Sequence, residues 1–186
     1  MRSSPVRAAR SRRSLRGAVV GLALVLALAG CTRSGSGAAV VDGASISVSD
    51  LNRALTELGP VYQGATPPAL LRALILGPTF LDVAAKYGAG ISDTQAVDSL
   101  KQAYAAQTLT PPQSFGPGAI TVVRFLLAND ALTPLPKASE AFAEAEVRAK
   151  LLHVEVSPRF GTLDVQTLEI VPLTHAWIVN GTPSAS

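Results

Sequence analysis

Few side chains in this sequence have the types and spacings that chemistry would need. The two histidines, His153 and His175, have no cysteine or acidic cluster beside them at ligand spacing, and a metal site needs three or four convergent ligands. Glu140, Glu144 and Glu146 fall within one short stretch of helical pattern, where such carboxylates form a solvated face. The sequence contains neither a Gly-x-Ser-x-Gly nucleophile elbow nor a glycine-rich phosphate loop. We therefore expect no enzyme activity, no catalytic residue, no metal, no cofactor and no small-molecule substrate.

The single cysteine is the one side chain whose setting indicates a modification. Cys31 follows Leu28-Ala29-Gly30 at the end of an apolar run and precedes a Gly/Ser-rich stretch. It has no partner for an internal disulfide, and a free thiol suits an oxidising compartment poorly. Leu-Ala-Gly-Cys resembles the bacterial lipobox, which implies cleavage between Gly30 and Cys31 and lipid on the new N-terminal cysteine. The alternative is a free or buried thiol.

The residues before Cys31 have the organisation of an export signal. Six arginines and no acidic residue occupy positions 1–16, and the thirteen residues over 17–29 are apolar. A basic start, about 7–15 apolar residues and small residues at the cut are typical of a signal peptide, whereas a transmembrane helix needs roughly 20. We interpret 1–30 as a lipoprotein signal peptide. Because Arg12-Arg13 also resembles the twin-arginine motif, both export routes stay open.

The charge of the chain changes once this signal is set aside. The whole sequence carries a net charge of +3, but six of its sixteen Lys and Arg residues lie in the first sixteen positions. The remaining ten face all thirteen Asp and Glu residues, which gives a net charge of −3. A mildly acidic domain lacks the clustered cations that nucleic-acid binding requires, so we expect no nucleic-acid partner. The length after Cys31 suits one domain.

Periodicity predicts a mainly α fold, in which a helical bundle is joined to a small two- or three-stranded sheet. A flexible spacer over 31–37 leads into strands at 38–41 and 45–48, separated by the turn pair Asp42-Gly43. Helical spacing then predicts helices over about 50–58, 67–87, 92–103, 119–130 and 137–151, with two helices or a kink at Gly77-Pro78. Alternation over 153–156 predicts a closing strand beside the first. We interpret 167–186 as a surface tail ordered in part by Trp177.

This layout resembles the N-terminal domain of SurA/PrsA-type chaperones, in which a strand and turn lead into helices and a closing strand returns beside the first. The resemblance is carried by Ala39-Val40-Val41-Asp42-Gly43 and by the segment 154–164, and it covers about residues 38–166. It implies a chaperone-like domain of the kind seen in actinobacterial SurA-like lipoproteins. Only about twenty residues follow Asp164, too few for the parvulin isomerase domain often found next, so we expect no isomerase activity.

Arg159 and Phe160, in the turn after the closing strand, are the candidate partner-binding residues. The alternative, which we prefer, is structural: Arg159 satisfies turn carbonyls or a carboxylate, and Phe160 caps the core. The sequence thus predicts a protein anchored to the cell membrane through lipidated Cys31, on the extracytoplasmic face, that binds unfolded exported polypeptides. A structural lipoprotein that docks on another envelope protein is the alternative.

Overall fold

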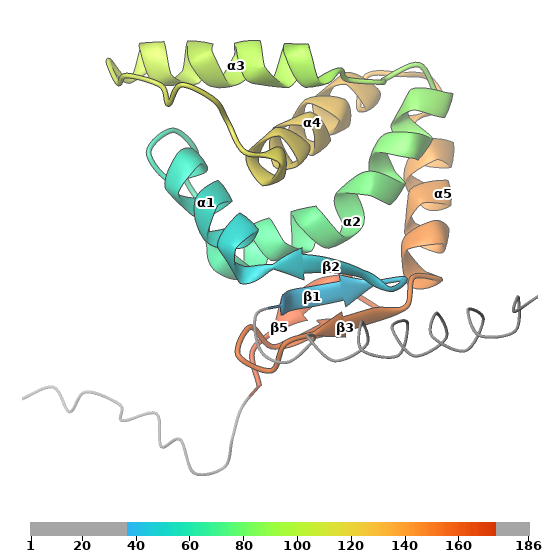
Figure 1. Ribbon diagram of the computed structural model, residues 1–186. Coiled ribbons are helices and arrows are strands. Elements are labelled where there is room, and N and C mark those ends of the chain that lie inside the picture. Colours follow the sequence, from blue (N-terminus) through green and yellow to red (C-terminus); the bar gives the residue numbers. More distant parts are fainter. Residues whose placement is uncertain (1–36, 174–186) are drawn as a thin grey trace, which may run out of the picture. The chain divides into compact units, whose positions relative to one another are not determined.

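The computed structural model describes residues 37–173, which form five helices and five short strands (Figure 1). The signal peptide, the Gly30–Cys31 cleavage site, His175 and Trp177 lie outside these residues. Gly37, expected to end the spacer, is the first residue of a strand. The elements in chain order are β1 (Gly37–Val41), β2 (Ala44–Ser47), α1 (Val48–Leu58), α2 (Pro67–Lys86), α3 (Asp93–Ala106), α4 (Pro117–Leu132), α5 (Ala138–Lys150), β3 (Val154–Val156), β4 (Thr162–Asp164) and β5 (Glu169–Val171).

The N-terminal strand β1 is the centre of a three-stranded antiparallel sheet in the order β2-β1-β3. Its turn into β2 uses Asp42 at φ 47° and Gly43 at φ 84°, the paired left-handed conformations of a tight hairpin. On its other side Val40 pairs with Glu155, more than a hundred positions along the chain. The predicted mainly α fold, with a small sheet that joins both ends of the domain, is confirmed.

Strands β4 and β5 form a separate antiparallel hairpin, which the sequence did not predict. Residues 167–173 therefore do not form a surface tail: Ile170 of β5 is buried in the main core, with an exposed fraction of 8%. The Asp164 carboxylate holds the turn by accepting a hydrogen bond from the Gln166 N–H at 2.8 Å, and hydrogen bonding lowers the pKa of Asp164. The ordered domain thus extends past residue 166 through β5.

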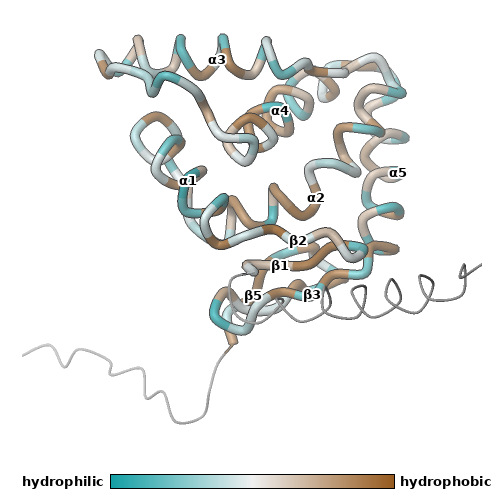
Figure 2. Tube along the Cα trace, in the orientation of Figure 1, coloured by the Kyte–Doolittle hydropathy of each residue, from teal (hydrophilic) through white to brown (hydrophobic). Residues whose placement is uncertain are grey.

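Helix α2 is the central helix, and it packs against α1, α4, α5 and the sheets. Figure 2 shows hydrophobic residues along most of its length. By length and composition α2 could span a membrane, but 56% of its most apolar window is buried within the domain, as in a core helix. Pro78 lies inside this single helix, so the two-helix alternative is wrong. At the adjacent Gly77, an added Cβ would lie 3.3 Å from Thr121 Cγ2, which shows how closely α4 approaches α2.

Helices α1 and α5 refine two details of the sequence prediction. Helix α1 begins two residues earlier than expected, because Ser47 is its N-cap and the side chain of Ser47 accepts a hydrogen bond from the Asp50 N–H at 3.0 Å. Helix α5 turns a row of buried alanines toward α2, and small side chains at this spacing allow close packing. Val147 is apolar, but it does not join this row of buried residues and is 61% exposed.

Candidate functional site

A groove of about 560 Å³ between α2, α4, α5 and the β4–β5 turn combines apolar walls with a polar rim. Three phenylalanines, one from each helix, line it: Phe80, Phe125 and Phe142. Leu126 also lines the groove and is 38% exposed, so the groove presents an apolar side chain to solvent. A hollow of this size with mostly apolar walls is typical of a binding site.

The three phenylalanines hold one another in place. The ring centroids of Phe80 and Phe125 are 4.8 Å apart in an edge-to-face arrangement, and those of Phe80 and Phe142 are 6.0 Å apart. Aromatic pairs at these separations contribute about 0.5–1.5 kcal/mol beyond the burial of their area. Phe80 is 8% exposed, so it forms the floor of the groove, whereas Phe125 and Phe142 are partly buried walls.

The rim of the groove is polar and carries both charges. Arg72 of α2 donates from Nε to the Leu168 carbonyl oxygen at 2.6 Å and lies 3.6 Å from the Glu169 carboxylate, which ties α2 to the β4–β5 turn. On the opposite side, Glu146 of α5 accepts a hydrogen bond from Lys150 Nζ at 2.6 Å. Leu168 reaches the rim with φ 55°, a conformation uncommon for a leucine. These contacts fix the shape of the groove and leave its walls apolar.

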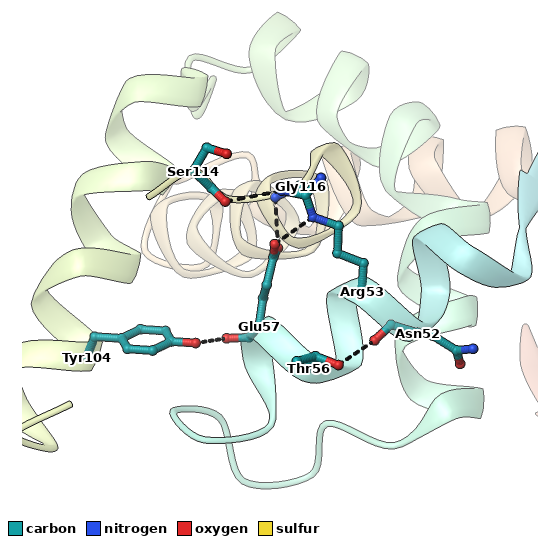
Figure 3. Close-up of polar contacts among 7 residues, drawn as sticks. All are labelled: Asn52, Arg53, Thr56, Glu57, Tyr104, Ser114 and Gly116. Carbon is teal, nitrogen blue, oxygen red and sulfur yellow. Dashed lines mark hydrogen bonds and ion pairs between the residues drawn. The ribbon is translucent and has the colours of Figure 1, made fainter. Parts of the chain in front are cut away.

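A second polar cluster, around Glu57, has a structural role (Figure 3). The Glu57 side chain is 8% exposed, accepting a hydrogen bond from Arg53 Nε at 2.7 Å and another from the Gly116 N–H at 2.8 Å. Arg53 also donates to the Ser114 carbonyl, and Tyr104 donates its hydroxyl to the Glu57 carbonyl at 2.7 Å. One carboxylate oxygen thus pairs with Arg53 on the same helix, and the other joins α1 to the loop before α4. These contacts give the cluster a role in holding the two segments together.

A third cluster joins the end of α2 to α5 on the surface. Glu144 accepts hydrogen bonds from Lys86 Nζ at 2.7 Å, Arg148 at 2.6 Å and the Tyr87 hydroxyl at 3.1 Å. The hydrogen bond from Lys86 is the main cause that lowers the pKa of Glu144, and the hydrogen bond to Glu144 raises the pKa of Tyr87. These shifts arise from pairing at an exposed surface and mark an ion-pair network that stabilises the helix contact.

The structure places Arg159 and Phe160 away from the groove, in the turn after β3. Phe160 is partly buried against the main core, as the structural interpretation expected. The guanidinium of the exposed Arg159 lies over the Phe160 ring, 5.0 Å from its centroid, and this contact differs from the expected one with turn carbonyls or a carboxylate. The two residues line a separate hollow with four prolines.

The remaining candidate groups do not converge. His153 is exposed, with its Nε2 3.6 Å from Glu155, and within residues 37–173 no group of three or more His, Cys, Asp or Glu residues could hold a metal ion. Glu140 faces Lys137 at 3.9 Å. The groove itself was missed by the sequence reasoning. Its only sequence signal was one phenylalanine in each of three apolar helix patterns, which also fits plain core packing.

No model of a known protein family, no curated protein and no solved structure matches this chain. The interpretation of function therefore depends on the geometry above and on the sequence motifs.

Proposed function

We propose that this protein is an exported, lipid-anchored, chaperone-like module that holds unfolded polypeptide segments in the groove between α2, α4 and α5. The observation that carries the proposal is the groove itself, with three phenylalanines and Leu126 inside a polar rim. Apolar side chains of an unfolded chain gain by leaving water, at about 25 cal/mol per Å² buried. Such a site selects for hydrophobicity rather than for a sequence.

The rim supports this mode of binding. Asn129, Gln166 and Thr167 line the groove beside its apolar walls, and their side chains can hydrogen-bond to the backbone of an extended segment. Arg72 and Glu146 provide one charge of each sign, so the groove has no strong preference for acidic or basic clients. These features favour transient binding of many sequences over tight binding of one ligand.

The location in this proposal comes from the sequence. The basic start, the apolar run and Leu-Ala-Gly-Cys support export followed by lipidation at Cys31. The antiparallel pairing of β1 with β3 supports the likeness to SurA-type domains, in which the first and closing strands lie together. Together these observations support an anchored protein on the extracytoplasmic face of the cell membrane.

The test is suppression of aggregation, followed by light scattering of a denatured exported protein diluted into buffer. The wild-type chain is expected to suppress scattering at stoichiometric amounts. Leu126→Glu places a charge on the groove wall and is expected to abolish the effect, because binding must then desolvate a carboxylate. Val147→Glu, an equally drastic change at a 61%-exposed position of α5 outside the groove, serves as control. Equal activity of the two variants, or no suppression by wild type, would contradict the proposal.

A second candidate function, docking on another envelope protein, is favoured by a different observation. Val147 and Leu151 are 61% and 80% exposed and lie four residues apart at the end of α5, so they share one face. Large exposed apolar side chains on one face are typical of protein interfaces. Co-purification of a stoichiometric partner that is lost in Val147→Glu and retained in Leu126→Glu would favour this function over the first.

A further inference from the structure

The turn that contains Arg159 and Phe160 lies where the chain enters the domain. The Ser157 N–H donates to the Ala38 carbonyl at 2.9 Å, and the Phe160 N–H donates to the Ser157 carbonyl at 2.9 Å. Because β3 runs antiparallel to β1, the residues after Val156 lie beside the start of β1 at Gly37. Figure 1 shows this turn at the end of the sheet where β1 begins.

The surface around this turn is apolar with one positive charge. It is a hollow of about 580 Å³, formed by the start of α2, the turn after β3 and the residues that follow β5. Four exposed prolines line it together with Phe160, Gly161 and Leu173, and Leu173 is 37% exposed. Among the described residues that line this hollow, Arg159 is the only charged one. We name this set of residues the entry surface.

The length of chain before β1 limits how far the entry surface can be from the lipid. Six residues separate Cys31 from Ala38, so the two are at most about 25 Å apart even in a fully extended chain. If acyl chains on Cys31 are in the bilayer, this short tether holds the start of β1, and the turn after β3 that lies beside it, close to the membrane. Helix α3 lies at the other end of the domain (Figure 1).

We propose that the entry surface rests on the headgroup region of an anionic phospholipid bilayer. This inference rests on the lipidation of Cys31 in the proposed function. The four prolines and Leu173 are apolar, and burial of apolar area at the boundary between headgroups and acyl chains favours membrane binding. Arg159 is exposed, and its guanidinium, which lies over the Phe160 ring, can bind a lipid phosphate. The contact would fix the orientation of the domain and leave α3 facing away from the membrane.

A labelling experiment on the native lipoprotein tests this orientation. Lipidation consumes the only cysteine, so Leu173→Cys introduces one free thiol for a fluorophore on the entry surface. Lys101→Cys, at a 60%-exposed side chain of α3, provides the matched control label. Both proteins are placed in vesicles of phosphatidylglycerol and phosphatidylcholine that contain a headgroup-attached nitroxide quencher. Quenching is expected at position 173 and not at position 101.

Charge reversal tests the role of Arg159. With the label at position 173, Arg159→Glu is expected to weaken docking about fivefold, whereas Lys101→Glu leaves it unchanged. Equal quenching at the two labels, or no effect of Arg159→Glu, would overturn the inference. Mass spectrometry of Cys31 in the same samples distinguishes failure of the lipid anchor from failure of the docking inference. An unmodified thiol overturns the anchor and the inference together, and a lipidated cysteine with equal quenching overturns the inference alone.

Discussion

Replacing Glu57 by alanine tests whether the buried polar cluster joins α1 to the loop before α4. The change leaves the Gly116 N–H without its acceptor, and a buried unpaired donor costs about 1–3 kcal/mol. It also removes the ion pair with Arg53, which contributes under about 1 kcal/mol because the Arg53 side chain is 49% exposed. We expect Glu57→Ala to lower the free energy of unfolding by about 1–4 kcal/mol in total.

The assay is urea unfolding followed by circular dichroism. Glu57→Gln is the matched control, because its amide oxygen can still accept from the Gly116 N–H, and we expect it to cost about half as much as the alanine variant. A double-mutant cycle with Arg53→Ala isolates the ion pair, with an expected coupling of about 0.5–1 kcal/mol. A cost for Glu57→Ala below about 0.5 kcal/mol, the range of an ordinary surface substitution, would refute this reasoning.

Three further predictions concern the groove, the hairpin and pH. Phe80→Ala removes the ring at the floor of the groove and is expected to lower the free energy of unfolding in urea by about 3–5 kcal/mol. A loss as small as that of a surface substitution would show that Phe80 does not hold Phe125 and Phe142 in place. Gly161→Ala should lower the melting temperature sharply, because Gly161 has φ 112° and an added Cβ would clash with the Val171 carbonyl oxygen; an unchanged melting temperature would contradict the β4–β5 register. Because pairing lowers the folded pKa of Glu144 from 4.5, its contribution to stability is present above pH 4.5 and is lost as pH falls through the folded pKa. Glu144→Gln should therefore make stability less dependent on pH in this acidic range, and an unchanged pH profile in scanning calorimetry would argue against the pairing.

The predictable part of this fold is the part with long or strictly periodic patterns. The alternation in Val154-Glu155-Val156 was enough to identify a strand, and its pairing with β1 followed from the order of the elements. Hairpin β4–β5 was missed because the apolar residues after Asp164 are scattered among turn formers, and because its turn depends on the side chain of Asp164. Burial of Ile170 in the main core stabilises this hairpin.

The candidate site was less accessible from the sequence than the fold. Each phenylalanine of the groove fits the apolar pattern of its own helix, but convergence of the three depends on how α4 and α5 cross α2. That crossing depends on small residues, Gly77 on α2 and the row of buried alanines on α5, which allow close approach and have no periodic signature of function. The exposure of Val147 could not be predicted either, because an apolar residue in a helical pattern is assigned to the buried face until the packing is known.

The claim that the groove holds unfolded polypeptide is tested most directly by site-specific photo-crosslinking. A photoreactive amino acid at position 126 lies in the groove wall, and one at position 147 lies on α5 outside it. With an unfolded exported client, crosslinks are expected from position 126 and not from position 147. When the same client is folded, no crosslinks are expected from position 126. Crosslinks from position 147 alone, or equal yields from both positions, would contradict binding in the groove.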